Sequence, residues 1–248
     1  MSKTIKQATV ISTKQLTPHL QRIIIASEEF INFTETLIGH YVKVLIPKTK
    51  LISETITAKN AYMRSYTIQD VHPLSGNITL DFVINMHQGP ATIWAQQTKV
   101  GDSIAIAGPG PTKLDDFSQE HYVLLGDLTS VNALKGYLKK LPTTARIDAF
   151  VHTPTEQDII SLDSDRHVNW LVTITPEQAL LDAIQNLTFK DPLPTIFMAL
   201  EAGLVSQLKD TFKNQYAITR TQIVSSGYWK KGLNAEDYKV LRQQSNNE

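Results

Sequence analysis

The stretch VGDSIAIAGPGPTK, residues 100–113, marks the point at which the pattern of the sequence changes. On its N-terminal side, short runs rich in β-branched and aromatic residues are separated by turn residues, which is typical of antiparallel strands. They predict a six-stranded antiparallel barrel that occupies residues 1–112. The runs cover residues 8–12, 20–26, 41–46, 65–69, 78–84 and 103–107.

On the C-terminal side, β-rich runs alternate with segments of helical length. Strands separated in this way need crossover connections, so they predict a parallel, doubly wound α/β domain over residues 113–248. Thr175 followed by Pro176 predicts one helix start with a capping hydroxyl. The strands are YVLLGD, IDAFVH, VNWLVTI, IFMAL and TQIVSSGYW, with helices expected at 130–141, 176–187 and 201–214.

A C-terminal helix is also predicted. Asn234 can cap a short helix that has Asp237 in its first turn and carries Tyr238 and Leu241 on one side. We expect this partly apolar helix to pack against the rest of the protein.

Composition excludes several classes of chemistry. The chain of 248 residues has no cysteine, which removes disulfides, iron–sulfur clusters and thiol catalysis, so any redox chemistry needs an organic cofactor. Lys plus Arg equals Asp plus Glu at 24 each, so no global basic field favours nucleic acid or an anionic membrane. The first residues contain no apolar signal core, and no apolar stretch approaches the ~20 residues that span a bilayer. We therefore expect a cytoplasmic monomer without nucleic-acid or membrane partners.

The tetrapeptide Arg64-Ser65-Tyr66-Thr67 falls on the fourth expected strand of the barrel. Side chains alternate along a strand, so Arg64 and Tyr66 share a face. A guanidinium that grips a pyrophosphate and a flat ring that covers an isoalloxazine would then point to one ligand, with Thr67 near the flavin's reactive nitrogen. An arginine and a tyrosine on a solvent-facing strand are also common, so this motif alone leaves a purely structural interpretation open.

A second motif comes after the fifth expected strand and the Asn85 that follows it. Gly89 allows close backbone approach, Pro90 starts a helix, and the free amides of Ala91 and Thr92 point out of its positive end. These features predict a phosphate seat made of main chain. A plain helix that caps the barrel explains this segment alone, but it explains the two motifs together poorly.

The motifs RSYT, GPATIWA, VGDSIAIAGPGP and SGYWKKG together resemble the siderophore-interacting protein family. This is a family of NAD(P)H-dependent ferric-siderophore reductases in the ferredoxin reductase-like superfamily, and the similarity runs in order through both halves of the chain. The resemblance implies bound FAD, with Arg64 at its phosphates, Tyr66 stacked on the isoalloxazine and Thr67 beside it. It also implies that Gly89, Ala91 and Thr92 hold the pyrophosphate. Family members often have a histidine where this sequence has Asn85, which can hydrogen-bond a flavin but cannot carry a proton.

The nicotinamide side is expected at the turn 126–130, which lies at the carboxyl edge of the parallel sheet, where ligands bind in this architecture. An N-capped structural helix explains this turn equally well. The resemblance matches the turn to the family's nicotinamide-side loop, and it matches residues 199–202 to an Ala-Gly-Glu turn in which Leu200 replaces the glycine. Residues 151–155 contain no arginine for a 2′-phosphate, which favours NADH over NADPH. The predicted cofactor-binding residues are Arg64, Ser65, Tyr66, Thr67, Asp81, Val83, Asn85, Gly89, Pro90, Ala91, Thr92, Asp127, Thr129 and Glu201.

Basic residues near the flavin are the candidates for substrate binding, because siderophore complexes are often anionic and oxygen-rich. We predict a shallow patch formed by Lys48, Lys230 and Lys231, with Lys50 and Arg242 as further candidates. Each of these residues is also explained by an ordinary solvated surface. The histidines show no metal-ligand spacing, and HExxH and GxSxG are missing, so no metal site or serine hydrolase is expected.

The sequence therefore predicts a flavoenzyme that transfers electrons from NADH or NADPH, through FAD, to ferric iron in a siderophore. A ferredoxin is an alternative electron donor. Two rival functions stay open: a general NAD(P)H:flavin or quinone reductase on the same scaffold, and a carrier that binds siderophores without catalysis.

Overall fold

The computed structural model describes residues 4–49, 55–233, 237–238 and 241. The chain divides into two compact units, Met1–Thr112 and Lys113–Glu248. Lys50, Asn234 and Arg242 lie outside the described residues, as does most of the segment for which we predict a C-terminal helix.

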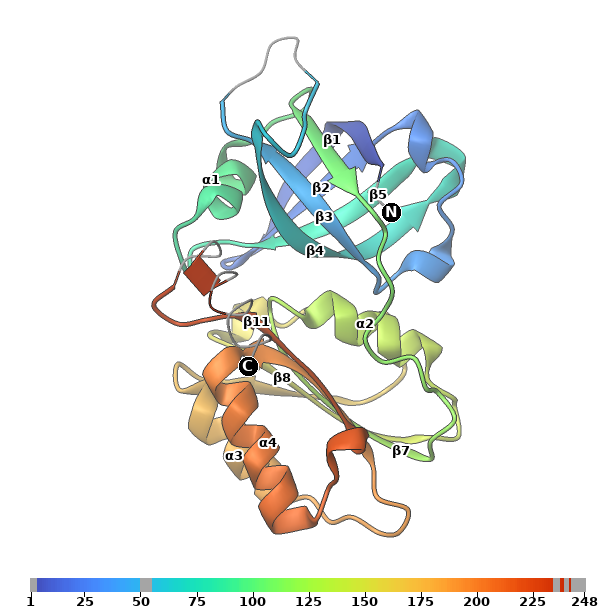
Figure 1. The fold of residues 1–248 in the computed structure, drawn as a ribbon, viewed down its shortest axis with the longest axis vertical. Coiled ribbons are helices and arrows are strands. Elements are labelled where there is room, and N and C mark those ends of the chain that lie inside the picture. The colour runs from blue at the N-terminus through green and yellow to red at the C-terminus, as the bar shows by residue number, and fades with distance from the viewer. Residues whose placement is uncertain (1–3, 50–54, 234–236, 239–240, 242–248) are drawn as a thin grey trace. The chain divides into compact units, whose positions relative to one another are not determined.

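The described strands of the first unit close into an antiparallel barrel in the order β1-β2-β5-β4-β3-β6 (Figure 1). This confirms the six-stranded barrel. The main differences from the expected strands are the greater lengths of β1 and β4. The bounds are β1 Ile5–Thr17, β2 Leu20–Ala26, β3 Tyr41–Pro47, β4 Ala61–His72, β5 Asn77–Val83 and β6 Ser103–Ala107.

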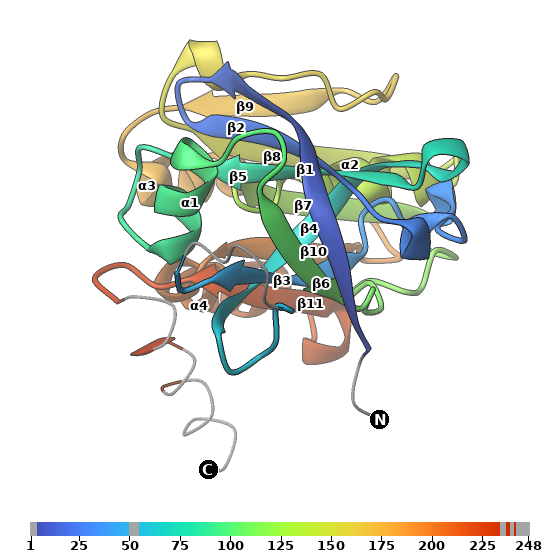
Figure 2. The ribbon, with the colours of Figure 1, turned by 90° about the horizontal axis from the view of Figure 1, so that it is seen from above.

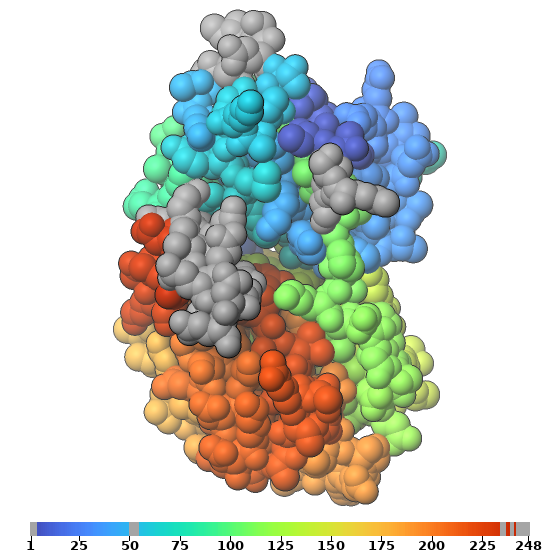
Figure 3. Space-filling view, viewed as in Figure 1, coloured from blue at the N-terminus to red at the C-terminus, as the bar shows by residue number. Residues whose placement is uncertain are grey.

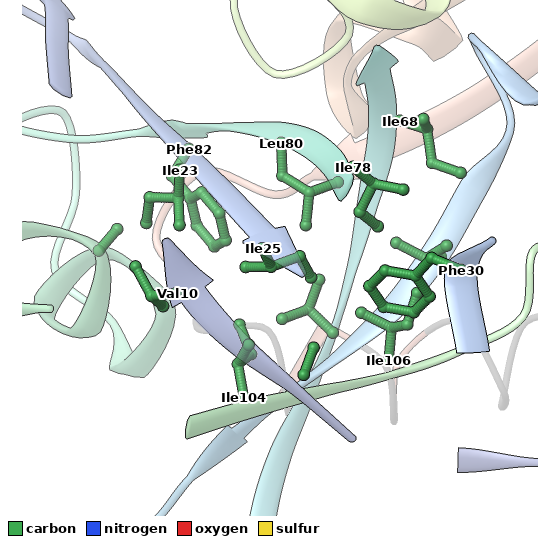
Figure 4. Close-up of a cluster of buried hydrophobic side chains, with 14 of the residues drawn as sticks. Val10, Ile23, Ile25, Phe30, Ile68, Ile78, Leu80, Phe82, Ile104 and Ile106 are labelled. Carbon is green, nitrogen blue, oxygen red and sulfur yellow. The ribbon is translucent and has the colours of Figure 1, made fainter. Parts of the chain in front are cut away.

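The barrel encloses its own apolar core. Alternate residues of each strand point inward, as the two-residue period of a strand requires, and inside the barrel they meet Phe30 from a connecting segment (Figure 4). Helix α1, Pro90–Gln97, packs against β2, β3, β4 and β5 and buries Ala91, Thr92 and Ala95. Short 3-10 turns complete the connections: η1 Glu28–Phe30, η2 Glu35–Leu37 and η3 Pro73–Ser75.

The second unit contains a parallel sheet with the strand order β11-β10-β7-β8-β9 among its described residues (Figure 2). This confirms the predicted parallel α/β domain. Strand β7 is buried along its whole length because it is central and covered on both faces, which explains its unbroken apolar run. The bounds are β7 His121–Asp127, β8 Arg146–Thr153, β9 Val168–Val172, β10 Thr195–Glu201 and β11 Ile223–Trp229.

Helices cover both faces of this sheet. Helix α2, Val131–Lys140, packs on one face with Tyr122 and Leu124, whereas α3, Pro176–Gln185, and α4, Ala202–Tyr216, pack on the other. Figure 3 shows α4, in orange, at the surface of this unit. The remaining 3-10 turns are η4 Glu156–Asp158 and η5 Arg220–Gln222.

One prediction about a helix start was wrong in detail. Thr175 is the N-cap residue of α3 and Pro176 occupies its first turn, but the Thr175 side chain makes no capping hydrogen bond. Its hydroxyl lies 3.0 Å from the hydroxyl of Thr173 instead. A neighbouring hydroxyl therefore competes with the helix amides for this group.

A buried ion pair fastens the segment between β8 and β9, which contains no α-helix in the described residues. Lys135 on α2 has a side chain that is 2% exposed, and its Nζ lies 2.6 Å from Oδ2 of Asp163. The side chain of Asp163 is 56% exposed, so the desolvation cost falls mainly on the lysine. The pair therefore satisfies a cation that would otherwise be buried alone.

We expect Asp163→Asn to lower the free energy of unfolding by about 1–3 kcal/mol, because it leaves the Lys135 ammonium buried without its counter-charge. Lys135→Met should cost clearly less, since it removes the buried charge as well. Urea denaturation of both variants measures this, with Asp165→Asn on the same exposed loop as the matched control. Equal losses for Asp163→Asn and Asp165→Asn would contradict the expectation.

Candidate functional site

The fourth strand of the barrel changes partner halfway along its length. Residues Ala61–Thr67 of β4 pair with β3, whereas the ladder to β5 begins only at Ile68, opposite Leu80. In the described part of the chain no ladder joins this first half of β4 to the end of β5, whose residues Asp81–Val83 pair with β2. The RSYT motif thus lies on a stretch of strand whose ladder to β3 is on one edge only, next to the helix α1.

An aromatic row lies beside this break in the β4–β5 ladder. The ring centroid of Tyr66 lies 4.1 Å from that of Phe82 on β5, and Phe82 lies 5.5 Å from Trp94 on α1. Tyr66 is half-buried, and its burial raises the pKa of its hydroxyl, against a smaller opposing effect of Arg64. The phenol is therefore neutral at physiological pH, and its ring is held from behind by the barrel core.

Basic side chains line the outer part of the same strand. The guanidinium of Arg64 lies 5.8 Å from the ring centroid of Tyr62, and Nζ of Lys48 lies 5.7 Å from the same ring. Arg64 also donates to the carbonyl of Met63, and the Ser65 hydroxyl accepts from Lys43 at 2.6 Å. The first unit thus brings Lys48 and Arg64 together around one aromatic ring.

The start of α1 has the features of a phosphate seat. Gly89 is the N-cap residue and Pro90 occupies the first turn, and the first N–H groups of a helix have no acceptor within it. A Cβ built at Gly89 meets nothing within 4 Å, so there is room for a ligand at this point. The hydroxyl of Thr92 is turned inward, toward the Val83 carbonyl at 3.4 Å and His87 Nε2 at 3.3 Å.

The other candidates near β5 have partners within the protein. Asp81 forms a two-point ion pair with Arg22 on β2, at 2.8 and 2.9 Å. Asn85 adopts a left-handed backbone conformation with φ 60°. Its amide donates to the Pro18 carbonyl at 2.8 Å and accepts from Gln96 at 2.6 Å, so it ties the end of β5 to α1 and to the β1–β2 turn.

In the second unit, the turn after β7 is tight because Gly126 lacks a side chain. A Cβ there would lie 2.6 Å from the Ser130 hydroxyl and 2.8 Å from Leu134. Asp127 is buried, and its Oδ1 accepts from the amide and hydroxyl of Thr129 at 2.8 and 2.5 Å. Its Oδ2 accepts from the indole of Trp229 on β11 at 2.9 Å. Burial raises the pKa of Asp127, while these hydrogen bonds oppose the shift.

Glu201 ends β10 at the same edge of the sheet. Its carboxylate accepts from the amides of Leu204 and Lys231 at 2.9 and 3.1 Å and lies 3.5 Å from Nζ of Lys230. Burial alone would raise the pKa of Glu201, but the amide donors and the Lys230 charge hold it below its usual value. The strand order places β7 and β10 side by side with their connections leading in opposite directions, which is the switch point where ligands bind in open α/β sheets.

Neither a metal site nor a membrane span is found in the part of the chain that the structure describes. No group of three or more His, Cys, Asp or Glu side chains there is placed to hold a metal ion. None of the helices there is both long enough and apolar enough to cross a bilayer.

Comparison with known proteins bears on both units. A model of the siderophore-interacting FAD-binding domain matches residues 9–113, and a model of the siderophore-interacting protein matches residues 119–232. The chain belongs to the siderophore-interacting protein family. Two curated proteins similar to this chain are named as a ferric vibriobactin reductase and a ferric acinetobactin reductase.

The ferric vibriobactin reductase ViuB of Vibrio cholerae is 28% identical over 246 residues, which cover 92% of this chain and 90% of that protein. The crystal structure of the siderophore-interacting protein SipS from Aeromonas hydrophila superposes with a TM-score of 0.84 at 25% identity, over 99% of both chains. Ferredoxin-NADP+ reductase from Plasmodium falciparum shares the fold, with a TM-score of 0.67 at 14% identity over 90% of this chain and 96% of that one.

Sequence reasoning missed several residues that complete these sites. Arg22 pairs with Asp81, and Tyr62 lies beside Arg64. Phe82 and Trp94 continue the aromatic row that begins at Tyr66. Trp229 donates to Asp127, which is 102 positions away in the sequence. Three of them left a signal, because Trp94 and Trp229 lie inside the motifs GPATIWA and SGYWKKG and Phe82 lies in an expected strand. The others depend on strand register, which a single sequence does not give.

The lowered pKa of Glu201 gives a pH-dependent contribution to stability. This contribution is present above the ordinary carboxyl pKa of about 4.3 and is lost as the pH falls through the lower pKa of the folded state. We expect Glu201→Gln to flatten the fall in unfolding free energy between about pH 5 and pH 3. Urea denaturation across this range checks it, with Glu177→Gln on the exposed side of α3 as control. Parallel curves for wild type and Glu201→Gln would refute it.

Proposed function

We propose that this protein is an FAD-dependent oxidoreductase that uses NADH or NADPH to reduce ferric siderophores and so releases iron in the cytoplasm. The observation that carries the proposal is the break in the β4–β5 ladder, where Arg64 and Tyr66 on β4 lie next to α1 within the matched FAD-binding domain. The curated relatives named as ferric vibriobactin and acinetobactin reductases support the same reaction.

The residues at this break in the β4–β5 ladder fit a flavin dinucleotide. Tyr66 offers a neutral, half-buried ring for an isoalloxazine, and β4 has no ladder to β5 on this stretch, so main-chain groups there suit its polar rim. The open space at Gly89 and the amides of Ala91 and Thr92 suit a pyrophosphate, whose charge Arg64 would balance. Ser65 and Thr67 flank Tyr66, Val83 is the last residue of β5, and Asn85 follows that strand.

When bound, FAD supplies the means to accept two electrons from a nicotinamide and to release them one at a time. The protein's part is to hold both substrates close and to exclude competing reactions. Oxidation of one NADH to NAD⁺ releases a proton and two electrons, which reduce two ferric ions to ferrous ions. Ferrous iron attracts hard oxygen donors less strongly, so the chelate loosens without a protein ligand to the metal.

The nicotinamide is proposed to bind at the carboxyl edge of the parallel sheet, near the turn that contains Asp127 and Thr129. After β8 the chain continues as His152-Thr153-Pro154-Thr155, without an arginine, and this supports NADH over NADPH. A ferredoxin as donor would need no nucleotide at this edge. We propose that the protein acts as a monomer.

The ferric siderophore is proposed to be held by charge. Lys48 lies beside Tyr62 in the first unit, and Lys230 and Lys231 follow β11 in the second. Long lysine side chains can hold an anionic chelate without a shaped pocket, which suits substrates of varied structure. A general flavin or quinone reductase on the same scaffold would not need these charges.

Gly89→Leu tests the phosphate seat. The added side chain enters open space, so the melting temperature should change little, but FAD affinity should fall about tenfold or more because the dinucleotide loses its path along the helix start. Flavin content after purification and a fluorescence titration measure this, with Gln88→Leu on the neighbouring exposed residue as control. Wild-type affinity in Gly89→Leu would remove the seat from the proposal.

A second variant tests the substrate. Replacing Lys48, Lys230 and Lys231 together by Gln should lower kcat/KM for an anionic ferric tris-catecholate by about 10- to 100-fold, because attraction by charge is lost. The rate at which NADH bleaches the flavin band should stay close to wild type. The matched control changes three exposed lysines elsewhere, Lys14, Lys190 and Lys213.

Three outcomes separate the functions in this assay. Unchanged ferric-chelate rates in the triple variant would favour the general reductase. A purified protein that is colourless, takes up no FAD and still binds the chelate would identify a carrier. A yellow protein whose absorbance is bleached by NADH and restored by the ferric chelate is the expected result.

A further inference from the structure

Two acidic residues at the switch point of the sheet are already bonded to the end of β11 and to the two residues that follow it. Asp127 on β7 accepts from the Trp229 indole, and Glu201 on β10 accepts from the Lys231 amide and pairs with the Lys230 ammonium. Residues 229–231 are therefore fastened at three consecutive positions to two different strands. A nicotinamide would find few free acceptors on either carboxylate.

The bond between Asp127 and Trp229 is the most constrained of these contacts. It joins β7 to β11 across the intervening β10. Asp127 is buried, and its other oxygen is used by both donors of Thr129. Each carboxylate oxygen thus has a partner, so loss of the indole would leave a buried acceptor unsatisfied.

The backbone just before Trp229 is held as well. A Cβ at Gly227 would lie 2.8 Å from Cβ of Ala202, so β11 approaches the start of α4 as closely as only a glycine permits. The hydroxyl of Tyr238 donates to the Gly227 carbonyl at 3.2 Å. The backbone that leads into Lys230 and Lys231 is therefore held in place where it leaves β11.

We propose that Asp127 and Trp229 are positioning residues for the ferric chelate: their bond sets the course of the segment that presents Lys230 and Lys231. This inference rests on the proposed function. The sequence predicts instead that Asp127 contacts the nicotinamide. In the structure, both carboxylate oxygens of Asp127 already accept hydrogen bonds from Thr129 and Trp229.

The test uses the full chain loaded with FAD. Its variants are Trp229→Phe, Asp127→Asn and the double variant, with Trp170→Phe on β9 as the matched control. The redox-inert gallium(III) complex of a tris-catechol chelator is titrated by fluorescence to give Kd without turnover. NADH-driven bleaching of the flavin and the melting temperature are measured on the same samples.

Each single substitution should raise the Kd for the gallium chelate about tenfold, which corresponds to about 1.4 kcal/mol, while Trp170→Phe leaves it unchanged. The double variant should be no weaker than the worse single one, because both changes remove the same bond. The rate constant for bleaching at saturating NADH should stay within about twofold of wild type in Trp229→Phe.

Unchanged chelate affinity in folded Trp229→Phe would overturn the inference and leave the proposed function intact. The inference would also fall if Asp127→Asn weakened NADH binding and spared the chelate, since Asp127 would then be a nicotinamide ligand. If the wild-type protein binds neither FAD nor the chelate, both the proposed function and this inference are refuted. Fully additive losses in the double variant would show that the two residues act separately, against the proposal.

Discussion

The proposed ligand site at β4 depends on a constraint on the main-chain hydrogen bonds of that strand. A strand that changes partner must leave part of one edge without a ladder, and β4 does so over Ala61–Thr67 while α1 packs beside it. Main-chain groups in such a place need partners, whether from water or from a ligand. On this stretch the barrel presents polar backbone and an aromatic face together, and the motif residues lie there.

Most of the fold followed from periodicity. The barrel strands 20–26 and 103–107 were predicted to the residue, since each is bounded by turn residues. The first residues of β4 were missed because Ala61, Tyr62 and Met63 precede Arg64 without alternation of apolar and polar side chains. Thr175 was assigned a cap that it does not make, because a propensity cannot tell which of two acceptors a hydroxyl finds.

The candidate site was harder to predict from the sequence than the fold was. Residue types at the break in the β4–β5 ladder were recognisable because they sit within two short motifs. The contacts that hold them, such as Arg22 with Asp81 and Trp229 with Asp127, join residues far apart in the chain. Their pairing is set by strand order and register, which depend on the whole sheet.

The pairing of Lys230 with Glu201 makes the two neighbouring lysines unequal. An anion that approaches Lys230 must compete with a carboxylate already 3.5 Å from its ammonium, so it gains only the difference between two attractions. The exposed Lys231 engages Glu201 through its backbone amide, which leaves its side-chain charge out of that competition. The affinity for a ligand should therefore depend on the ligand's charge mainly through Lys231. Lys230 should contribute only when the ligand's negative charge is strong enough to compete with Glu201.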